Sequence, residues 1–423
     1  MREMKDSGIE WAGQIPAEWK VEKNKRLFFE VNNKCLETDS YTLLSVSEYY
    51  GVAPRAEKIK DGDFETRAES LDGYKICHKN DIVMNIMLAW KRATARTSYD
   101  GIVSPAYCVY RGKDIETRYY HYVFRTEGCA DYFKRHSTGI IDSRLRLYPE
   151  SFFNLNSPVP PIIEQKQIAD FLDNRCSEID AISADIQKEI ETLAQYKRSV
   201  ITEAVTKGLN PAVEMKDSGV AWCPQIPSHW QYTNPKGLFG LRTDRAFRDD
   251  RQLTASQEYG IVYQDEYMEK TGNRVVMVTK DFSILKHVEP DDFVISMRSF
   301  QGGLEYSDKR GCISSAYVML IPNKEFVHAP FYRWFFKSSK YINALQSTSN
   351  LVRDGQAMRY ANFVKVPLFI VPIEEQKAIA SYLDEKIEKV NSILAAKKKQ
   401  LEILSNYKKS LIYEYVTGKK EAT

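Results

Sequence analysis

The stretch EQKQIADFLDNR occupies residues 164–175, and 211 residues later the chain repeats it as EQKAIASYLDEK at residues 375–386. Two further pairs of segments share this offset: MKDSGIEWAGQIPAEW (4–19) with MKDSGVAWCPQIPSHW (215–230), identical at ten of sixteen positions, and YKRSVITEAVT (196–206) with YKKSLIYEYVT (407–417). An offset of half the chain is far longer than the period of a solenoid repeat. The sequence is therefore a tandem duplication of a domain-sized copy.

Each copy of this stretch opens a long segment with the periodicity of a helix. Apolar residues recur at alternating steps of three and four, which indicates a helix with a coiled-coil seam. The predicted seam residues are Ile168, Leu172, Ile179, Ile186 and Leu193 in the first helix and Ile379, Leu383, Val390, Leu401 and Leu404 in the second. Proline precedes each segment and glycine follows it, which suits a helix start and stop. We expect roughly 44 residues, or about 66 Å, in each helix.

The short connection between the copies predicts how the two helices run. The first helix ends near Gly208 and the second copy opens at Met215, and a gap of about seven residues spans at most roughly 25 Å. A second helix that starts beyond this gap and packs on the first can only run back along it. We therefore expect an antiparallel coiled-coil pair, with one globular block at each end and a pseudo-two-fold axis between them. Each MKDSG start motif should pack against the end of the other copy's helix.

The duplication divides the chain into four segments. We predict a first block at residues 1–160, a first helix at 161–209, a second block at 210–370 and a second helix at 371–423. Within the blocks, NDIVMNIM (80–87) pairs with DDFVISMR (291–298), and GIVSPAYCVYR (101–111) pairs with GCISSAYVMLI (311–321). Alternating Val, Ile, Tyr and Met between turn residues predicts short strands. The segments 117–136 and 329–346 read as helices, so each block is predicted to be α+β.

The composition places the chain among folded proteins of ordinary charge. Hydrophobic residues make up 43% and aromatic residues 12%, enough for packed cores. A net charge of +3 is too weak to predict nucleic-acid binding by itself. We read no signal peptide and no membrane span, and the seven scattered cysteines form no C-x-x-C pair. We therefore expect a cytoplasmic protein with buried thiols, without a disulfide scaffold or a zinc ribbon.

The loops that differ most between the two blocks are basic. Arginine and glutamine can read base edges with two hydrogen bonds, and Ser, Thr and Lys can hold phosphates. Duplicated blocks that keep a frame and diverge in their loops are typical of paired recognition modules. The predicted DNA-binding residues are Trp90, Lys91, Arg92, Arg96, Ser143, Arg144 and Arg146 in the first block and Arg298, Ser299, Gln301, Arg353, Gln356 and Arg359 in the second.

Motifs of catalysis are missing from the sequence. It has no Walker A pattern, no G-x-G-x-x-G, no G-x-S-x-G and no adenine-methyltransferase pattern of Asn or Asp before two prolines and an aromatic residue. The six histidines lack the spacing of metal ligands. We therefore predict a chain without catalytic residues and without a metal site.

The doubled motif E-Q-x-x-I-A-x-x-L-D before a long helix, together with the doubled start S-G-[IV]-x-W-x-x-x-I-P-x-x-W, resembles the specificity subunit of type I restriction–modification systems. The resemblance covers essentially the whole chain. It implies that each block is a target-recognition domain that reads one half of a split, asymmetric DNA site. It also implies that the antiparallel helices set the number of unread base pairs between the halves.

The resemblance further implies partners and cofactors. Two methyltransferase subunits, which carry S-adenosylmethionine and methylate adenine, would dock on the helices. Two motor–nuclease subunits would join them for restriction that depends on ATP and Mg, which implies a role in phage defence. The specificity subunit itself binds none of these cofactors. The predicted helices are about two turns of B-DNA long, at roughly 34 Å per turn.

Two other hypotheses stay open from the residues alone. One is a structural coiled-coil adaptor that joins partners without reading bases, and the divergent basic loops count against it. The other is a standalone DNA methyltransferase, and the missing cofactor and catalytic motifs count against it.

Overall fold

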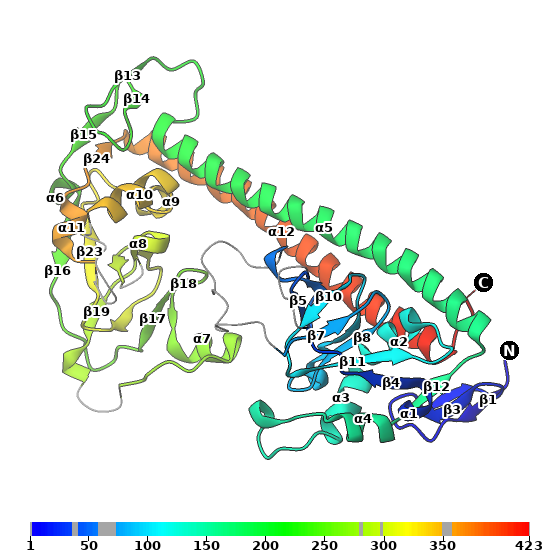
Figure 1. Cartoon of the computed structure of the whole chain (residues 1–423). Coiled ribbons are helices and arrows are strands. Elements are labelled where there is room, and N and C mark those ends of the chain that lie inside the picture. Colours follow the sequence, from blue (N-terminus) through cyan, green and yellow to red (C-terminus); the bar gives the residue numbers. More distant parts are fainter. Residues whose placement is uncertain are drawn as a thin grey trace. The chain divides into compact units, whose positions relative to one another are not determined.

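The chain folds into two compact units. The computed structural model describes residues 2–35, 41–57, 73–278, 282–296, 299–348 and 358–422. Unit 1 comprises Met1–Ile186 and Lys399–Thr423, and unit 2 comprises Gln187–Lys398. Each unit therefore joins one block to the beginning of one long helix and the end of the other (Figure 1). The division of the chain into four segments stays a prediction.

The two long helices form where the repeated stretch predicts them. Helix α5 spans Ile162–Lys207 with 46 residues, and α12 spans Ile373–Val416 with 44 residues. Glycine follows each of them in the left-handed conformation, with φ of 75° at Gly208 and 68° at Gly418. A residue without Cβ adopts this conformation without strain, so glycine ends a helix sharply. The predicted helices and their stop signals are confirmed.

The helices run antiparallel within each unit. In unit 1 the ring of Phe171 on α5 stacks on Tyr415 of α12 with centroids 4.3 Å apart, and Asp180 accepts from Lys408 at 2.6 Å. In unit 2, Lys197 on α5 donates to Asn391 of α12 at 2.7 Å. Residue numbers rise along one helix as they fall along the other, so the predicted antiparallel pairing is confirmed.

The first block is built on a four-stranded antiparallel sheet with the order β4-β11-β8-β9. Its strands are β4 (Phe28–Val31), β11 (Tyr107–Gly112), β8 (Ile82–Asn85) and β9 (Thr94–Arg96). Two-stranded ladders accompany it: β1 (Met4–Asp6) with β2 (Gln14–Pro16), β3 (Lys20–Lys23) with β12 (Asn156–Val159), β5 (Leu44–Ser47) with β6 (Gly51–Pro54), and β7 (Lys75–Cys77) with β10 (Gly101–Val103). Its helical segments are α1 (Asn24–Leu27), α2 (Thr117–Phe124), α3 (Glu127–Arg135), α4 (Pro149–Asn154) and the 3-10 turns η2 (Arg55–Glu57), η3 (Ala89–Lys91) and η4 (Asp142–Arg144).

The second block repeats this topology strand for strand. Its sheet has the order β16-β23-β20-β21, with β16 (Phe239–Arg242), β23 (Val318–Pro322), β20 (Phe293–Ile295) and β21 (Glu305–Tyr306). The ladders are β13 (Met215–Asp217) with β14 (Gln225–Pro227), β15 (Gln231–Thr233) with β24 (Leu368–Ile370), β17 (Leu253–Ser256) with β18 (Gly260–Tyr263), and β19 (Lys286–Val288) with β22 (Gly311–Ile313). Its helical segments are α6 (Pro235–Leu238), α7 (Gln264–Thr271), η5 (Phe282–Ile284), α8 (Ser299–Gly302), α9 (Ala329–Phe335), α10 (Ser339–Ser347) and α11 (Tyr360–Val364). The predicted α+β blocks and their shared strands are confirmed.

Each block has an aromatic core, and the start motif of the block packs against it. Trp19 and Trp230, which end the two start motifs, are fully buried. A Cβ on Gly418 would lie 2.8 Å from the Trp19 ring, and a Cβ on Gly208 would lie 3.9 Å from the Trp230 ring. Each start motif thus packs against the end of the other copy's helix, as predicted. Among the described residues, no helix combines the length and apolar composition needed to cross a membrane.

Candidate nucleic-acid interface

The repeated glutamate of the opening stretch ties each long helix to the start motif of its block. Glu164 accepts a hydrogen bond from the Trp19 indole at 2.9 Å and from the Arg2 guanidinium at 2.8 Å. Glu375 accepts from the Trp230 indole at 3.0 Å. Each buried indole N–H thereby has an acceptor, which burial of a polar group requires. The same contact made twice explains why this residue recurs in both copies.

The repeated glutamine fixes the beginning of a short helix in each block. The side-chain oxygen of Gln165 accepts from the Glu116 amide at 2.9 Å, just before α2. Gln376 accepts from the His328 amide at 2.8 Å, just before α9. In both copies the side-chain NH₂ donates to a backbone carbonyl that precedes the long helix. The buried amides therefore connect the long helix to the N-terminus of α2 or α9.

The repeated aspartate makes a second contact with the same short helix. Asp173 accepts from the Tyr122 hydroxyl at 2.8 Å and from Arg118 at 3.1 Å, both on α2. Asp384 accepts from the Trp334 indole of α9 at 2.6 Å. Helices α2 and α9 are thus held on the long helices at two places, which gives each block a rigid support.

The predicted seam residues divide into two groups. Most are buried, and those at the start of each helix belong to the block cores: Ile168, Leu172 and Ile179 in unit 1 and Ile379 and Leu383 in unit 2. Val390 is also buried, whereas Ile186, Leu193, Leu401 and Leu404 are half-buried. The first group therefore anchors the helix in a block as well as on the other helix.

Three predicted residues of the first block lie on the turn between β8 and β9. Trp90 and Lys91 belong to η3, and Arg92 closes it in the left-handed conformation with φ of 65°. The Trp90 indole donates to the Met87 carbonyl at 3.1 Å, so it holds the turn together. Lys91 is exposed, and Trp90 and Arg92 are half-exposed. We call residues 86–93 the reading turn of the first block.

A second predicted loop contacts this reading turn. The Leu147 amide donates to the Ile86 carbonyl at 2.9 Å. The Lys134 ammonium lies 4.8 Å from the centre of the Trp90 ring and pairs with Asp142 at 2.9 Å. The structure therefore brings together two loops that are about fifty residues apart in the sequence.

The other predicted residues of the first block differ in availability. Ser143 and Arg144 are exposed on the loop around η4. Arg146 is half-exposed and donates to backbone carbonyls of its own loop. Arg96 donates to the Asn80 side chain at 2.7 Å. Arg96 and Arg146 thus have local partners, whereas Ser143 and Arg144 point to solvent-accessible positions.

The second block places its predicted residues less uniformly. Gln301 on α8 and Arg359 before α11 are exposed. Ser299 is only 1% exposed, and its hydroxyl accepts from the Ser296 amide at 2.8 Å, so it builds the start of α8 and is not a surface contact. Serine is common near helix starts, and the sequence alone does not separate this role from a surface contact. Three predicted residues lie outside the described residues: Arg298, Arg353 and Gln356.

A cavity of about 1060 Å³ lies beside the reading turn in unit 1. Tyr49, Arg92 and Arg125 line it from the block, and Asp180 and Lys408 line it from the two long helices. Unit 2 has a cavity of about 680 Å³ at the equivalent place, where Lys197 and Asn391 occupy the positions of Lys408 and Asp180. The duplication therefore places a cavity between block and helices in each unit.

Two basic residues that sequence reasoning missed lie behind the reading turn of the first block and behind α8 of the second block. Arg125 follows α2 and donates to the Arg92 carbonyl at 2.8 Å. Lys337 follows α9 and donates to the Gly302 carbonyl at 2.9 Å. Burial, followed by the neighbouring charge of Arg92, lowers the pKa of Arg125 to about 10. The one signal in the sequence is that both positions carry a cation when the two short helices are aligned.

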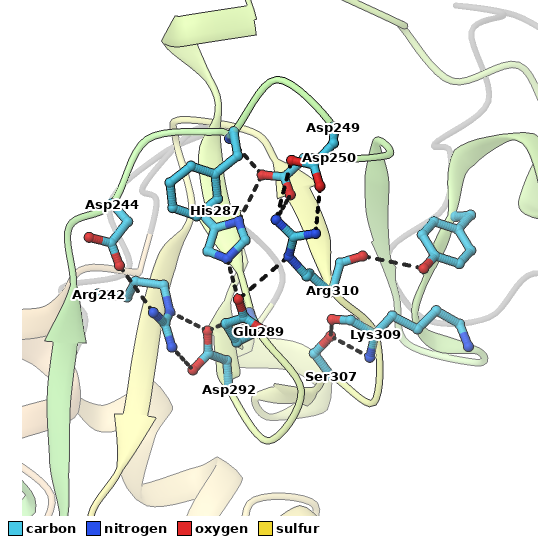
Figure 2. Close-up of polar contacts among 12 residues, drawn as sticks. Arg242, Asp244, Asp249, Asp250, His287, Glu289, Asp292, Ser307, Lys309 and Arg310 are labelled. Carbon is cyan, nitrogen blue, oxygen red and sulfur yellow. Dashed lines mark hydrogen bonds and ion pairs between the residues drawn. The ribbon is translucent and has the colours of Figure 1, made fainter.

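A network of charged side chains joins several loops of the second block (Figure 2). His287 is 1% exposed, and its ring nitrogens lie 2.7 Å from Asp250 and 2.7 Å from Glu289. Arg310 pairs with Asp249 at 2.8 Å and lies 3.6 Å from Glu289. The arginine is compensated by three carboxylates, so this network stabilises its loops and offers little free positive charge to a phosphate.

The first block also has an acidic and a basic residue at two of these positions, but the two have changed places. His78 and Asp100 form a hydrogen bond at 3.0 Å where the second block has Glu289 and Arg310. A buried aspartate lies nearby in both copies. Asp81 is bound by Arg111 of β11, and Asp292 is bound by Arg242 of β16, as Figure 2 shows for the second block. Burial raises the pKa of Asp292 despite its arginine. The frame is therefore kept although its charged pairs have changed.

Comparison with known proteins shows which family this arrangement is similar to. A family model described as the type I restriction modification DNA specificity domain matches residues 227–403. These residues therefore resemble the DNA specificity domain of type I restriction–modification systems. The predicted resemblance to their specificity subunits is confirmed.

Two curated relatives come from Methanocaldococcus jannaschii. The putative type I restriction enzyme MjaX specificity subunit is 26% identical over 277 residues, which cover 63% of this chain and 59% of the relative. The type I restriction enzyme MjaVIII specificity subunit is 23% identical over 279 residues, which cover 63% of each chain. The matched part thus spans less than two thirds of these relatives.

Two solved structures share the fold along nearly the whole chain. One is a chain described under "Structural basis underlying complex assembly and conformational transition of the type I R-M system", with a TM-score of 0.66, 12% identity, and coverage of 95% of this chain and 98% of that one. The other is the HsdS subunit from Thermoanaerobacter tengcongensis, with a TM-score of 0.50, 13% identity, and coverage of 96% and 98%. The fold of two α+β domains with long antiparallel helices is confirmed.

Proposed function

We propose that this chain is the subunit that reads DNA sequence in a type I restriction–modification complex, with each block reading one half of a split site. The observation that carries the proposal is the reading turn. The same sheet position, between β8 and β9 or between β20 and β21, holds Trp90, Lys91 and Arg92 in one copy and Gln301 and Gly302 in the other. A shared frame with different tips reads different bases, so the site is asymmetric.

The chemistry of the first block's tip supports contact with DNA. Lys91 and Arg144 are exposed cations, and Trp90 offers an aromatic face beside them. Arginine can bind guanine with two hydrogen bonds, whereas lysine can neutralise a phosphate. With a net charge of +3, the isolated chain binds DNA weakly and in a salt-sensitive manner, and partner subunits supply further phosphate contacts.

The long helices serve in this proposal as spacer and as docking surface for two methyltransferase subunits. Each helix exposes an isoleucine and a tyrosine at equivalent positions: Ile182 at 49% and Tyr196 at 43% on α5, and Ile393 at 46% and Tyr407 at 55% on α12. Exposed apolar side chains that recur at duplicated positions support two equivalent docking sites. The methyltransferase and motor–nuclease partners carry S-adenosylmethionine, ATP and Mg, and this chain supplies no catalytic group.

A methylation map tests this proposal directly. The chain is co-expressed with its cognate methyltransferase subunit in a host that lacks adenine methylation, and all modified adenines are sequenced. A split, asymmetric motif with a fixed gap is expected. Methylation without a defined motif by an assembled complex would refute base reading and favour the adaptor hypothesis. Methylation by the purified chain alone would refute the non-catalytic role.

A pair of variants assigns the reading turn to one half of the motif. Arg92→Ala removes a half-exposed cation from the tip and is expected to relax the motif in one half only, by about tenfold at the affected base pair. Lys188→Ala, which removes an exposed cation from α5, is the matched control and leaves both halves unchanged. Equal loss in both halves for Arg92→Ala would contradict the assignment.

A further inference from the structure

Arg125 holds two separate turns of the first block with one guanidinium. Besides the Arg92 carbonyl at 2.8 Å, it donates to the carbonyls of Ser47 at 3.2 Å and Glu48 at 2.8 Å. Ser47 ends β5, and Glu48 opens the turn to β6, whose Tyr49 is 84% exposed. The Glu48 carbonyl lies outside the strand ladder, so it needs a donor of another kind. Arg125 is therefore the link between the hairpin turn and the reading turn.

Carbonyl binding, not ion pairing, is the role of this side chain. Within the residues that the structure describes, no carboxylate lies within ion-pair distance of Arg125. Desolvation of an unpaired cation is unfavourable, as the lowered pKa of Arg125, about 10, shows. An apolar residue would fill the same space without this cost but would leave the turn carbonyls without a donor. The planar guanidinium fork can serve several carbonyls at once.

The second block has the same device in a different chemical form. Lys337 donates to the Gly302 carbonyl at 2.9 Å and to the Glu305 carboxylate at 2.6 Å. Its hairpin turn, between β17 and β18, also contacts α8, because a Cβ on Gly302 would lie 2.8 Å from the Gln257 side chain. Arg125 and Lys337 stand equally far beyond Glu116 and His328, whose amides bind the repeated glutamines. They are equivalent positions of the two copies.

We propose that Arg125 and Lys337 are positioning residues for DNA readout, each fixing the tip of its block by binding the carbonyl at the end of the reading turn. This inference rests on the proposed function and adds the residues that hold each tip in position for readout. The support runs from the long helix through Asp173 to α2 and then through Arg125 to the reading turn. Readout needs side chains held within a fraction of an ångström, which a loop alone does not provide.

The test compares methylation maps of complexes that contain the full chain. Arg125→Met removes the donors, and Arg125→Lys keeps the charge but binds fewer carbonyls. We expect Arg125→Met to raise methylation at sites with one mismatch in the first half by about tenfold relative to the cognate site, with the second half unchanged. Arg125→Lys should show a smaller rise. Lys337→Met should relax the second half alone.

The matched control is Arg135→Met, which removes a cation of α3 that pairs with Glu10 in the same block. It should leave both halves of the motif unchanged. Hydrogen exchange gives an independent readout: Arg125→Met should speed exchange in residues 45–53 and 86–97 but not in residues 253–263 or 299–306. A variant that only lowered overall stability would change all four segments together.

The outcomes separate this inference from the proposed function. If the wild-type complex gives no split motif, the proposed function fails. If the wild type gives a split motif and Arg125→Met gives the same motif with the same discrimination, this inference alone fails. Relaxation of both halves by Arg125→Met would also overturn it. If Arg125→Met does not assemble, Arg125→Lys decides, because an unchanged first half would overturn the inference and a relaxed one would support it.

Discussion

At the scale of single residues, His121 shows how burial sets a charge. It lies on α2, and its Nδ1 accepts a hydrogen bond from the Arg96 amide at 3.3 Å, so this nitrogen carries no proton. Burial, and then the charges of Arg125, Arg96 and Lys408, lower the pKa of His121 to about 3. The neutral ring is therefore part of the support behind the reading turn.

This shift predicts a loss of stability in mild acid. The unfolded chain binds a proton at His121 below about pH 6.5, whereas the folded chain does so only near pH 3. The contribution of His121 to the free energy of unfolding is thus complete above about pH 6.5, and the stability falls by about 1.4 kcal/mol per pH unit below it. His121→Asn, which keeps an acceptor, should show a flatter dependence of the melting temperature between pH 7 and pH 5. His136→Asn, at an exposed histidine, is the control, and equal slopes for wild type and His121→Asn would contradict this view.

Glu164 predicts a difference between two equivalent residues. Its carboxylate binds Arg2, and both side chains are less than a fifth exposed, at 17% and 18%. Glu375 has instead His229, whose side chain is 44% exposed. Glu164→Gln should therefore lower the free energy of unfolding by about 1.5–3 kcal/mol, and Glu375→Gln by less than about 1 kcal/mol. Denaturant titration of the two variants measures this, and equal losses would show that the arginine contributes nothing.

From the sequence, only the exposure of loop residues was predictable, where residue type and loop position indicate it, and the roles of these residues stay predictions. Exposed basic tips such as Lys91 and Arg144 could be proposed from their type and loop position. Ser299 could not, because a serine that starts a helix and a serine that binds phosphate look alike in a sequence. Arg125 and Lys337 were missed since a lone cation after a short helix has no pattern, and its partners are carbonyls that only the tertiary fold brings near.

At the scale of elements, the long helices were the most predictable part. Their period, proline starts and glycine stops gave the bounds to within a few residues. What the pattern could not give was the partner of each apolar residue. Ile168 and Leu172 belong to a block core, whereas Tyr196 and Tyr407, which continue the same spacing, are exposed at 43% and 55%. Periodicity shows which face is apolar but not what covers it.

The seam predicts how the spacer length can be changed. Glu189, in the segment Gln187–Leu193 of α5, forms an ion pair at 2.5 Å with Lys397, in the segment Leu394–Gln400 of α12. Deleting both segments removes one heptad from each helix, which preserves the seam and shortens the pair by about 10 Å. The gap of the methylated motif should then shorten by about three base pairs, with both half-sites unchanged.

The control for this deletion breaks the seam. Removing five residues instead of seven from each helix turns the apolar face by about 140° from its partner, so assembly should fail or the melting temperature should fall sharply. An unchanged gap in the heptad variant, with the complex assembled and active, would show that the helices do not set the spacing.

At the scale of the whole molecule, duplication has kept a frame while its polar pairs diverged. His78 and Asp100 in one copy stand where Glu289 and Arg310 stand in the other, and the buried aspartate takes its arginine from β11 in one copy and from β16 in the other. The backbone amide and indole contacts of the repeated stretch did not change in this way. They join elements that every variant of a block needs, whereas the charged pairs are local and can be replaced together.

The reciprocal packing of the copies predicts that the chain can be permuted. Each start motif packs against the glycine that ends the other copy's helix, so the connection at residues 209–214 and the stretch after Gly418 play the same role. A variant that begins at Met215 and joins Thr423 directly to Met1 should fold, melt close to the wild-type temperature and give the same methylation motif. A variant opened at Gln187, inside α5, is the control and should lose assembly because it cuts a helix that both units share. Loss of one half-site by the first variant would show that the order of the copies matters beyond their contacts.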